Sequence, residues 1–508
     1  MSAKVLSACF VGLDTEIIEV EADISRSLSN FIIVGLPDTA VQESKERVRS
    51  AIKNSGFQFP TTRIAVNLAP ADLKKEGPSY DLPIALSVLI AQEELIPKID
   101  LISDSLFLGE LSLDGNLRPV SGAILIAMAA KHKGLSRIFI PKANAAEANL
   151  IADINVFPVE NLKEIVTYLQ GGIDIQPLEK IKYEIPDDKI YEHDFAYIKG
   201  QESAKRALEI AAAGGHNMLM NGPPGAGKTL LAKSVLSILP KMSSEELLEV
   251  TRLYSLAGLL THDNHLITER PFRNPHHTAS GIALIGGGTW PRPGEISLAH
   301  RGVLFLDELP EFPRHVLENL RQPLEDGTVT VSRAAMSIKF PAQFILVAAK
   351  NPCPCGFLTD LAKRCTCTAT QVLKYNKKIS GPLLDRIDIH IEVPKIEFEK
   401  LSSMQLAENS AIVRGRIEKA REIQRQRFKD FKIFTNNEMK SQEVRFFCTT
   451  DTKTNNLLRL AMNQFHLSAR SYFKILKLSR TIADLEASPE ILYKHVAEAL
   501  QYRPKVIE

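Results

Sequence analysis

Apolar positions divide the chain into three regions with different periodicity. Residues 1–170 alternate β-like apolar runs, such as residues 63–67, with helix-spaced stretches, such as residues 82–92. Residues 194–400 repeat strand and helix patterns in alternation, which predicts a parallel sheet with helices packed on it. Residues 401–508 lack glycine-rich strand punctuation, and their apolar residues recur at helical spacing. The pattern predicts an α/β core followed by a helical region.

A polar stretch separates the first region from the second. Residues 171–193 begin with two glycines and continue with charged residues and prolines, a composition typical of a linker. A chain of 508 residues exceeds a single hydrophobic core, so we expect separate domains at 1–170, 194–400 and 401–508.

Composition adds few constraints on function. Hydrophobic residues make up 44% and charged residues 24%, as in ordinary globular proteins. No run of about 18 apolar residues occurs and the N-terminus does not have the pattern of a secretory signal, so we expect a cytoplasmic protein without a membrane span. The net charge of +2 means that contact with a polyanion requires a local basic patch.

Residues 222–229 carry the clearest chemical motif, G-P-P-G-A-G-K-T, between a short apolar run and a helical stretch. Glycines allow backbone N–H groups to approach phosphate oxygens closely, and the N-terminus of the following helix favours negative charge. We expect Lys228 to reach the β- and γ-phosphates of a nucleotide and Thr229 to ligate Mg²⁺. The expected nucleotide contacts are Gly222, Pro223, Pro224, Gly225, Ala226, Gly227, Lys228, Thr229 and Leu230.

A second motif follows at the end of an apolar run, residues 302–306, which closes with Asp307 and Glu308. A strand buried in a parallel sheet delivers its last residues to the sheet edge where nucleotides bind. We therefore expect Asp307 to hold Mg²⁺ through water and Glu308 to orient the attacking water.

Two further polar residues have alternative interpretations. Asn351 follows another apolar run and could contact the γ-phosphate or the water, but an Asn before Pro352 is also typical of a turn. Arg386 could stabilise charge in the nucleotide site of a neighbouring subunit, or form an ordinary salt bridge with Asp385 or Asp388.

Four of the six cysteines lie within fifteen residues, in two C-x-C pairs. In a reducing compartment such clustering favours metal over disulfides, and four thiolates can enclose a tetrahedral Zn²⁺. The one-residue spacing departs from the usual two to four residues, so another metal or four free thiols are alternatives. The expected structural zinc ligands are Cys353, Cys355, Cys365 and Cys367.

Basic residues offer candidate contacts with nucleic acid. Residues 326–339 read as a β-hairpin, in which Arg333 and Lys339 could contact a phosphate backbone. Residues 412–429 carry seven basic side chains, which fit either a nucleic-acid surface or a solvated helix face. The paired His276 and His277 lack acids nearby in the sequence, so a structural or DNA-facing role is more typical than metal binding.

Taken together, these motifs resemble the magnesium-chelatase-like AAA+ ATPases, and within them the competence-associated ComM/YifB branch. Further signatures of that branch are F-R-N-P-H-H at 272–277, P-R-P-G-E at 291–295 and N-P-C-P-C-G at 351–356. The resemblance implies an AAA+ P-loop core with a helical lid, working as a homo-hexameric ring that hydrolyses ATP between subunits. It also implies that Asn351 is sensor 1, Arg386 the arginine finger acting in trans, Arg470 sensor 2, and the hairpin a pore element.

The same resemblance implies a DNA motor, a helicase with branch-migration activity on single-stranded or branched DNA in natural transformation. A magnesium-chelatase-type ATPase subunit and an ATP-dependent protease or protein remodeller are the alternatives.

The first region resembles the α+β proteolytic domain of Lon-type proteases, with Ser79 where their nucleophile lies. Their partner lysine is expected near position 124, where the sequence has Ile124. A serine nucleophile requires an adjacent base, so we expect a non-catalytic domain unless Lys74 or Lys75 supplies it.

Overall fold

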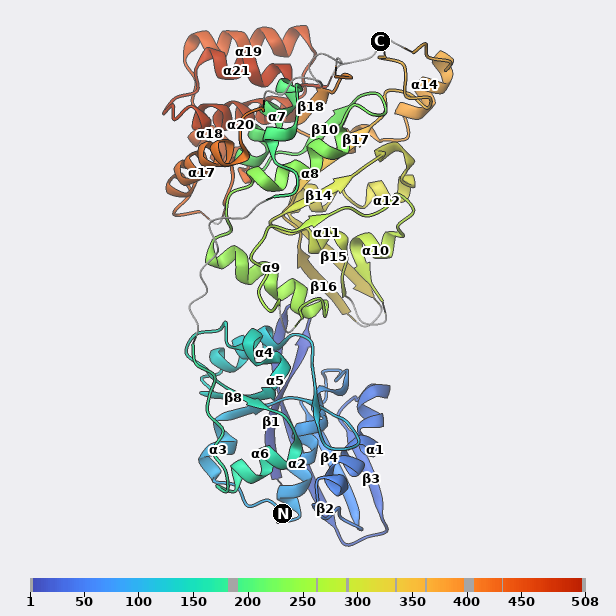
Figure 1. Cartoon of the computed structure of the whole chain (residues 1–508), viewed down its shortest axis with the longest axis vertical. Coiled ribbons are helices and arrows are strands. Elements are labelled where there is room, and N and C mark those ends of the chain that lie inside the picture. Colours follow the sequence, from blue (N-terminus) through green and yellow to red (C-terminus); the bar gives the residue numbers. More distant parts are fainter. Residues whose placement is uncertain are drawn as a thin grey trace. The chain divides into compact units, whose positions relative to one another are not determined.

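The computed structural model describes residues 3–180, 191–261, 264–288, 292–333, 336–360, 363–396, 406–431 and 433–504. The chain divides into two units (Figure 1). The N-terminal unit comprises Met1–Ile185 and Leu247–Ile267, and the C-terminal unit comprises Pro186–Glu246 and Thr268–Glu508. Among the described residues, no helix combines the length and hydropathy that a membrane span requires.

The N-terminal unit is built on a seven-stranded mixed sheet of order β3-β4-β2-β1-β5-β8-β9. Strand β2 pairs antiparallel with β1 and β4, whereas the remaining neighbours are parallel. This mixture, with helices against the sheet, gives the α+β class expected from the sequence. Its strands are β1 (Ala3–Val11), β2 (Asp14–Ser25), β3 (Asn30–Val34), β4 (Arg63–Ala69), β5 (Ser105–Phe107), β8 (Arg137–Pro141) and β9 (Asn155–Val159), with a small hairpin of β6 (Glu110–Leu111) and β7 (Leu117–Arg118).

Helix α2 (Asp81–Ala91) lies in the core of this unit rather than on its surface. Every residue from Asp81 to Leu89 is buried, so the helix is enclosed on all sides and contacts β1, β2 and α1. Arg47 from α1 neutralises the buried Asp81, with Nε 2.7 Å from Oδ2. The other helices are α1 (Thr39–Asn54), α3 (Ile99–Ser103), α4 (Ala123–His132), α5 (Lys142–Ala148), α6 (Leu162–Leu169) and the 3₁₀ turn η1 (Pro78–Tyr80).

The segment Leu247–Ile267 groups with the N-terminal unit, although it follows the phosphate-loop helix in the chain. It holds most of α9 (Ser244–Leu256), and the Ser255 hydroxyl there donates to the Glu147 carboxylate. Glu147 also accepts from the Ile124 amide at 3.0 Å, and burial raises its pKa. The periodicity of the sequence gave no indication that the chain returns to its first unit.

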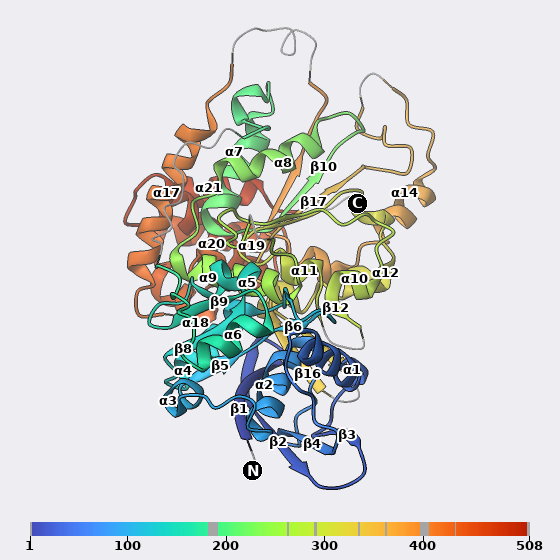
Figure 2. The same ribbon diagram turned by 60° about the horizontal axis from the view of Figure 1, so that its bottom comes forward.

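The C-terminal unit contains a five-stranded, fully parallel sheet of order β11-β14-β17-β10-β18. The apolar runs of its strands are buried, as in a sheet covered by helices on both faces. Helices α7 (Glu202–Gly214) and α8 (Lys228–Ile238) lie beside β10 (Figure 1, Figure 2). The strands are β10 (Met218–Asn221), β11 (Phe272–Arg273), β14 (Val303–Leu306), β17 (Ile345–Lys350) and β18 (Ile389–Glu392).

Short elements connect these strands. The predicted hairpin is present as β15 (Thr328–Arg333) and β16 (Met336–Pro341), paired antiparallel. A second, shorter hairpin joins β12 (Gly286–Gly287) to β13 (Arg292–Pro293). The connecting helices are α10 (Gly281–Ile285), α11 (Glu295–Leu298), α12 (Arg314–Glu318), α13 (Pro323–Asp326), α14 (Ala369–Asn376) and α15 (Gly381–Leu384), with 3₁₀ turns η2 (Phe195–Tyr197) and η3 (Leu309–Glu311).

The C-terminal region is helical, as its periodicity predicts, and it corresponds to the lid that the family resemblance implies. Helix α17 packs on α7 and α8, and α20 packs on α7 and α17. The buried apolar residues of the lid and of the α/β core therefore form one continuous hydrophobic cluster. The lid consists of α17 (Ser410–Arg427), α18 (Ser441–Phe447), α19 (Thr452–Gln464), α20 (Ala469–Leu485) and α21 (Tyr493–Gln501), with the turn η4 (Asn436–Glu438).

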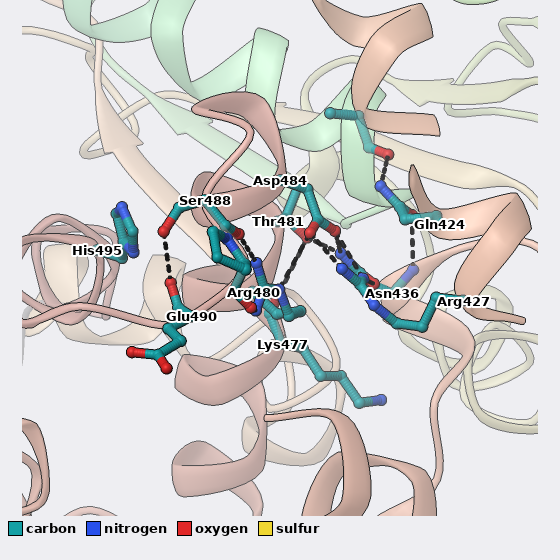
Figure 3. Close-up of polar contacts among 12 residues, drawn as sticks. Gln424, Arg427, Asn436, Lys477, Arg480, Thr481, Asp484, Ser488, Glu490 and His495 are labelled. Atoms are coloured by element: carbon teal, nitrogen blue, oxygen red, sulfur yellow. Dashed lines mark hydrogen bonds and ion pairs between the residues drawn. The ribbon is translucent and has the colours of Figure 1, made fainter. Parts of the chain in front are cut away.

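A buried carboxylate organises the lid (Figure 3). Asp484, 1% exposed, accepts hydrogen bonds from Arg427, from Arg480 at 3.0 Å and from Asn436 at 2.8 Å. Two guanidinium groups and an amide therefore share one acid, which compensates for burying all three.

The basic stretch 412–429 lies in α17 except for its last two residues, and several of its cations have structural partners. Arg416 bonds to Glu209 at 2.7 Å, Arg427 to Asp484, and the buried Arg421 to the Ala212 carbonyl at 2.9 Å. The expectation of either a nucleic-acid surface or a solvated face is therefore wrong for these three arginines, because tertiary contacts bring acids and carbonyls to them.

Replacing Asp484 with Ala leaves Arg427 and Arg480 buried without their shared carboxylate. Breaking such a pair costs about 3–5 kcal/mol, so we expect Asp484→Ala to lower the free energy of unfolding by that amount in urea denaturation of the full chain. Glu422→Ala is the matched control, because Glu422 pairs with Arg425 on the exposed side of α17 and should contribute under about 1 kcal/mol. Equal effects of the two substitutions would contradict the central role of Asp484.

Candidate nucleotide site

The phosphate-loop motif lies between β10 and α8, in the strand–loop–helix setting that the sequence predicts. Gly225 and Gly227 adopt left-handed backbone angles, with φ of 77° and 85°. No neighbouring atom lies within 4 Å of the position that a Cβ would take at either glycine. The loop is therefore open above its backbone, and a phosphate can approach its amides and the N-terminus of α8.

Lys228 lies at the centre of this loop. Its Nζ donates to the Gly222 carbonyl at 2.6 Å, to the Pro223 carbonyl at 2.9 Å and to Asn351 Oδ1 at 3.1 Å. Burial lowers the pKa of Lys228, and the charges of Asp307 and Glu308 oppose that shift. The contact with Asn351 arises because β10 and β17 are parallel neighbours whose carboxyl ends meet.

Thr229 and Asp307 meet at the same edge of the sheet. The Thr229 hydroxyl donates to Asp307 Oδ2 at 2.8 Å. This hydrogen bond places the carboxylate expected to hold Mg²⁺ through water beside the hydroxyl expected to ligate the ion.

Glu308 extends the site toward solvent. It has a positive φ of 49°, a backbone strain that is frequent at functional sites, and its side chain is 53% exposed. Its amide donates to Asp307 Oδ1 at 2.9 Å. This exposed carboxylate next to the cation position suits the activation of water.

His277 is a site residue whose place the sequence interpretation missed. Its Nδ1 lies 3.9 Å from Glu308 Oε2, and its ring packs edge-on against Phe312. Its place could have been inferred from the sequence, because His277 follows β11 by four residues. Parallel strands end at one edge of the sheet, so the residues after β11 lie near Asp307 and Glu308, which follow β14.

Arg386 and Arg470 lie together at the opposite edge of the sheet. Arg386 bonds to Glu325 and to the Pro382 carbonyl at 2.6 Å, and Arg470 lies 3.8 Å from Glu325. The Arg386 carbonyl accepts from Asn217, which directly precedes β10. The phosphate loop follows β10, and four strand residues span about 13 Å. The two arginines are therefore separated from Lys228 by the length of a strand.

The four clustered cysteines converge after β17. Their sulfur atoms all lie within 4.8 Å of one another, with 3.4 Å between Cys353 and Cys355 and 3.5 Å between Cys355 and Cys365. None of these four cysteines forms a disulfide. Tetrahedral zinc with Zn–S bonds of about 2.3 Å needs sulfurs about 3.8 Å apart, so the cluster fits that ion.

Of the two candidate DNA contacts on the hairpin, the structure describes the side chain of Lys339 only. Lys339 is exposed on β16, opposite Thr330. The backbone of Arg333 ends β15, whereas its side chain and the tip residues 334–335 lie outside the described residues.

The N-terminal unit offers no assembled serine site around Ser79 among the residues the structure describes. Ser79 lies in η1, directly before α2. Lys75 is fully buried and donates to the Leu73 carbonyl at 2.7 Å, and Lys74 pairs with Glu76 at 2.5 Å. Ile124 is buried in α4. Both nearby lysines are therefore engaged with other groups.

Comparison with known proteins identifies the family. Models described as "Magnesium chelatase, subunit ChlI", "Subunit ChlI of Mg-chelatase" and "Magnesium chelatase, subunit ChlI C-terminal" match residues 194–401, 20–144 and 407–503. Competence protein ComM of Haemophilus influenzae is 44% identical over 99% of this chain and 98% of its own length. YifB of Escherichia coli is 43% identical over 97% and 95%, and Lon protease 2 of Bacillus subtilis 25% identical over 45% and 47%. The chain belongs to the ComM/YifB family of magnesium-chelatase-like AAA+ ATPases.

Proposed function

We propose that this chain hydrolyses ATP with Mg²⁺ at the phosphate loop. The observation that supports this most directly is a pair of contacts at one edge of the sheet. Lys228 bonds to Asn351 at 3.1 Å, and Thr229 bonds to Asp307 at 2.8 Å. Bound Mg²⁺ would neutralise charge on the phosphates. Lys228 would bind the β- and γ-phosphates, Thr229 and Asp307 would hold the cation, and Glu308 would orient the attacking water.

We propose further that the active site is completed by a neighbouring copy of the chain in a homo-hexameric ring. Arg386 and Arg470 converge on Glu325 at the amino edge of the sheet, whereas the phosphate loop is at the carboxyl edge. An arginine so placed cannot reach the phosphates of its own subunit, but it can face those of the next. Arg386 is then the arginine finger, and Arg470 acts beside it.

The work coupled to hydrolysis is, in this proposal, movement of single-stranded or branched DNA, with helicase and branch-migration activity in natural transformation. Support comes from the similarity to a protein named for competence, and from the hairpin that exposes Lys339. A cytoplasmic location fits this role, because ATP and reduced thiols are available there. A magnesium-chelatase-type subunit is the second candidate, favoured by the three family models.

Two substitutions test ATP hydrolysis. Lys228→Ala should abolish nucleotide binding, because it removes the buried cation of the loop. Glu308→Gln should bind ATP but lose turnover by roughly 10²-fold or more, because an amide cannot activate water. Binding and steady-state hydrolysis are measured with and without forked DNA. An ATPase that no DNA stimulates, and that moves no strand, would reject the DNA motor and favour the chelatase-type alternative.

Mixing two inactive variants tests the shared active site. Arg386→Ala should lose roughly 10³-fold or more in hydrolysis rate, because the charge of the transition state is no longer stabilised. Adding Lys228→Ala subunits, which keep Arg386, should restore part of the activity. A Lys228→Ala/Arg386→Ala double variant is the control and should restore none. Equal rates in the two mixtures would contradict action in trans.

The hairpin is tested by the double substitution Arg333→Ala/Lys339→Ala. If both cations contact phosphates, DNA affinity should fall for all sequences, and the slope of log affinity against log salt should decrease by about 0.7 per lost contact on single strands. Fluorescence anisotropy over a salt series provides the measurement. Lys419→Ala, which removes an exposed cation of α17, is the matched control. An unchanged slope would exclude the hairpin from DNA binding.

A further inference from the structure

The four-cysteine cluster is attached to the nucleotide pocket at two points. The first attachment runs along the chain, because Cys353 is two residues beyond Asn351 and Asn351 bonds to Lys228. Cys353 is also fully buried, so the start of the cysteine loop is part of the packed core. A displacement of this loop would therefore move the side chain of Asn351, which contacts Lys228.

The second attachment is a direct backbone approach to the phosphate loop. A Cβ built on Gly356 would lie 2.7 Å from Pro224 Cδ, closer than real Cβ atoms lie, and 3.1 Å from Cγ, which is a tight contact. Gly356 also has a φ of 83°, which side chains rarely adopt. Only glycine fits here, since the cysteine loop lies against the second proline of the phosphate-loop motif.

Between β17 and α14 this segment is held by side-chain contacts and not by regular secondary structure. Lys395 pairs with Asp360 at 2.5 Å and lies over the ring of Phe357. Residues 351–368 contain no helix or strand in the part that the structure describes. One end is tied to α14, where Lys350 Nζ donates to Asn376 Oδ1 at 2.9 Å. A metal that joins Cys353 and Cys355 to Cys365 and Cys367 would close the intervening loop and fix Gly356 in place.

We propose that the cluster binds a structural Zn²⁺ whose function is to hold the phosphate loop and Asn351 in the nucleotide-binding arrangement. Loss of the metal then lowers nucleotide affinity without requiring the protein to unfold. The inference rests on the proposed ATP site, and it adds a metal requirement to that site. The four thiols lose their protons on binding, so the ion is held as a tetrathiolate.

Gly356→Ala tests the contact while keeping all four ligands. We expect zinc to remain at one per chain and affinity for a fluorescent Mg²⁺–ATP analogue to fall by roughly 10-fold or more, since ångström-scale displacement of positioning groups costs on the order of 10²-fold. Gly134→Ala is the matched control, because Gly134 has a φ of 74° and nothing within 4 Å of its Cβ position. Equal affinities in the two variants would overturn the proposed contact.

Cys365→Ser tests the metal independently of the contact. The full-length variant should lose zinc, measured by elemental analysis, and lose nucleotide affinity, while far-UV circular dichroism stays unchanged. Cys448→Ser, outside the cluster, should retain both. Wild-type protein without bound zinc, or a zinc-free variant with full nucleotide affinity, would refute the proposed role of zinc. Neither result would contradict the proposed ATP site. Zinc-loaded wild type that binds no ATP would instead refute the proposed function.

Discussion

The parallel sheet of the C-terminal unit imposes the constraint on which its functional groups depend. All five strands run the same way, so the residues that follow them gather at one edge and the residues that precede them gather at the other. Lys228, Asp307 and Asn351 meet because they follow β10, β14 and β17. Arg386 precedes β18 and therefore lies at the opposite edge of the sheet. One strand direction thus separates two sets of charged residues by the length of a strand.

Buried polar contacts hold the second set together. Lys474, one turn after Arg470 in α20, donates to the Ile387 carbonyl at 2.9 Å and lies 3.9 Å from Asp388. Burial alone would raise the pKa of Asp388, but its hydrogen bond with His216 and the charge of Lys474 lower it to about 2. The carboxylate therefore stays ionised and fixes the lid helix to the loop that carries Arg386. A movement of the lid helix α20 would therefore also move Arg386.

The N-terminal unit is held together by a buried carboxylate at the start of α4. Glu147 accepts hydrogen bonds from the amide of Ile124 and from the hydroxyl of Ser255. Ser255 comes from the segment Leu247–Ile267, which follows the phosphate-loop helix in the sequence. The carboxylate of Glu147 therefore joins segments that are far apart in the sequence.

The sequence alone predicted the α/β core, the helical C-terminal region and the hairpin, because strand, helix and turn periodicities are local properties. It also indicated the phosphate loop and the strand end at Asp307 and Glu308, because each of these motifs lies within a few consecutive residues. The place of His277 beside Glu308, the pairing of Arg386 with Arg470 on Glu325 and the burial of Arg421 were decided only in three dimensions. Each depends on which strands become neighbours and which acids approach from distant segments, and no local pattern encodes that.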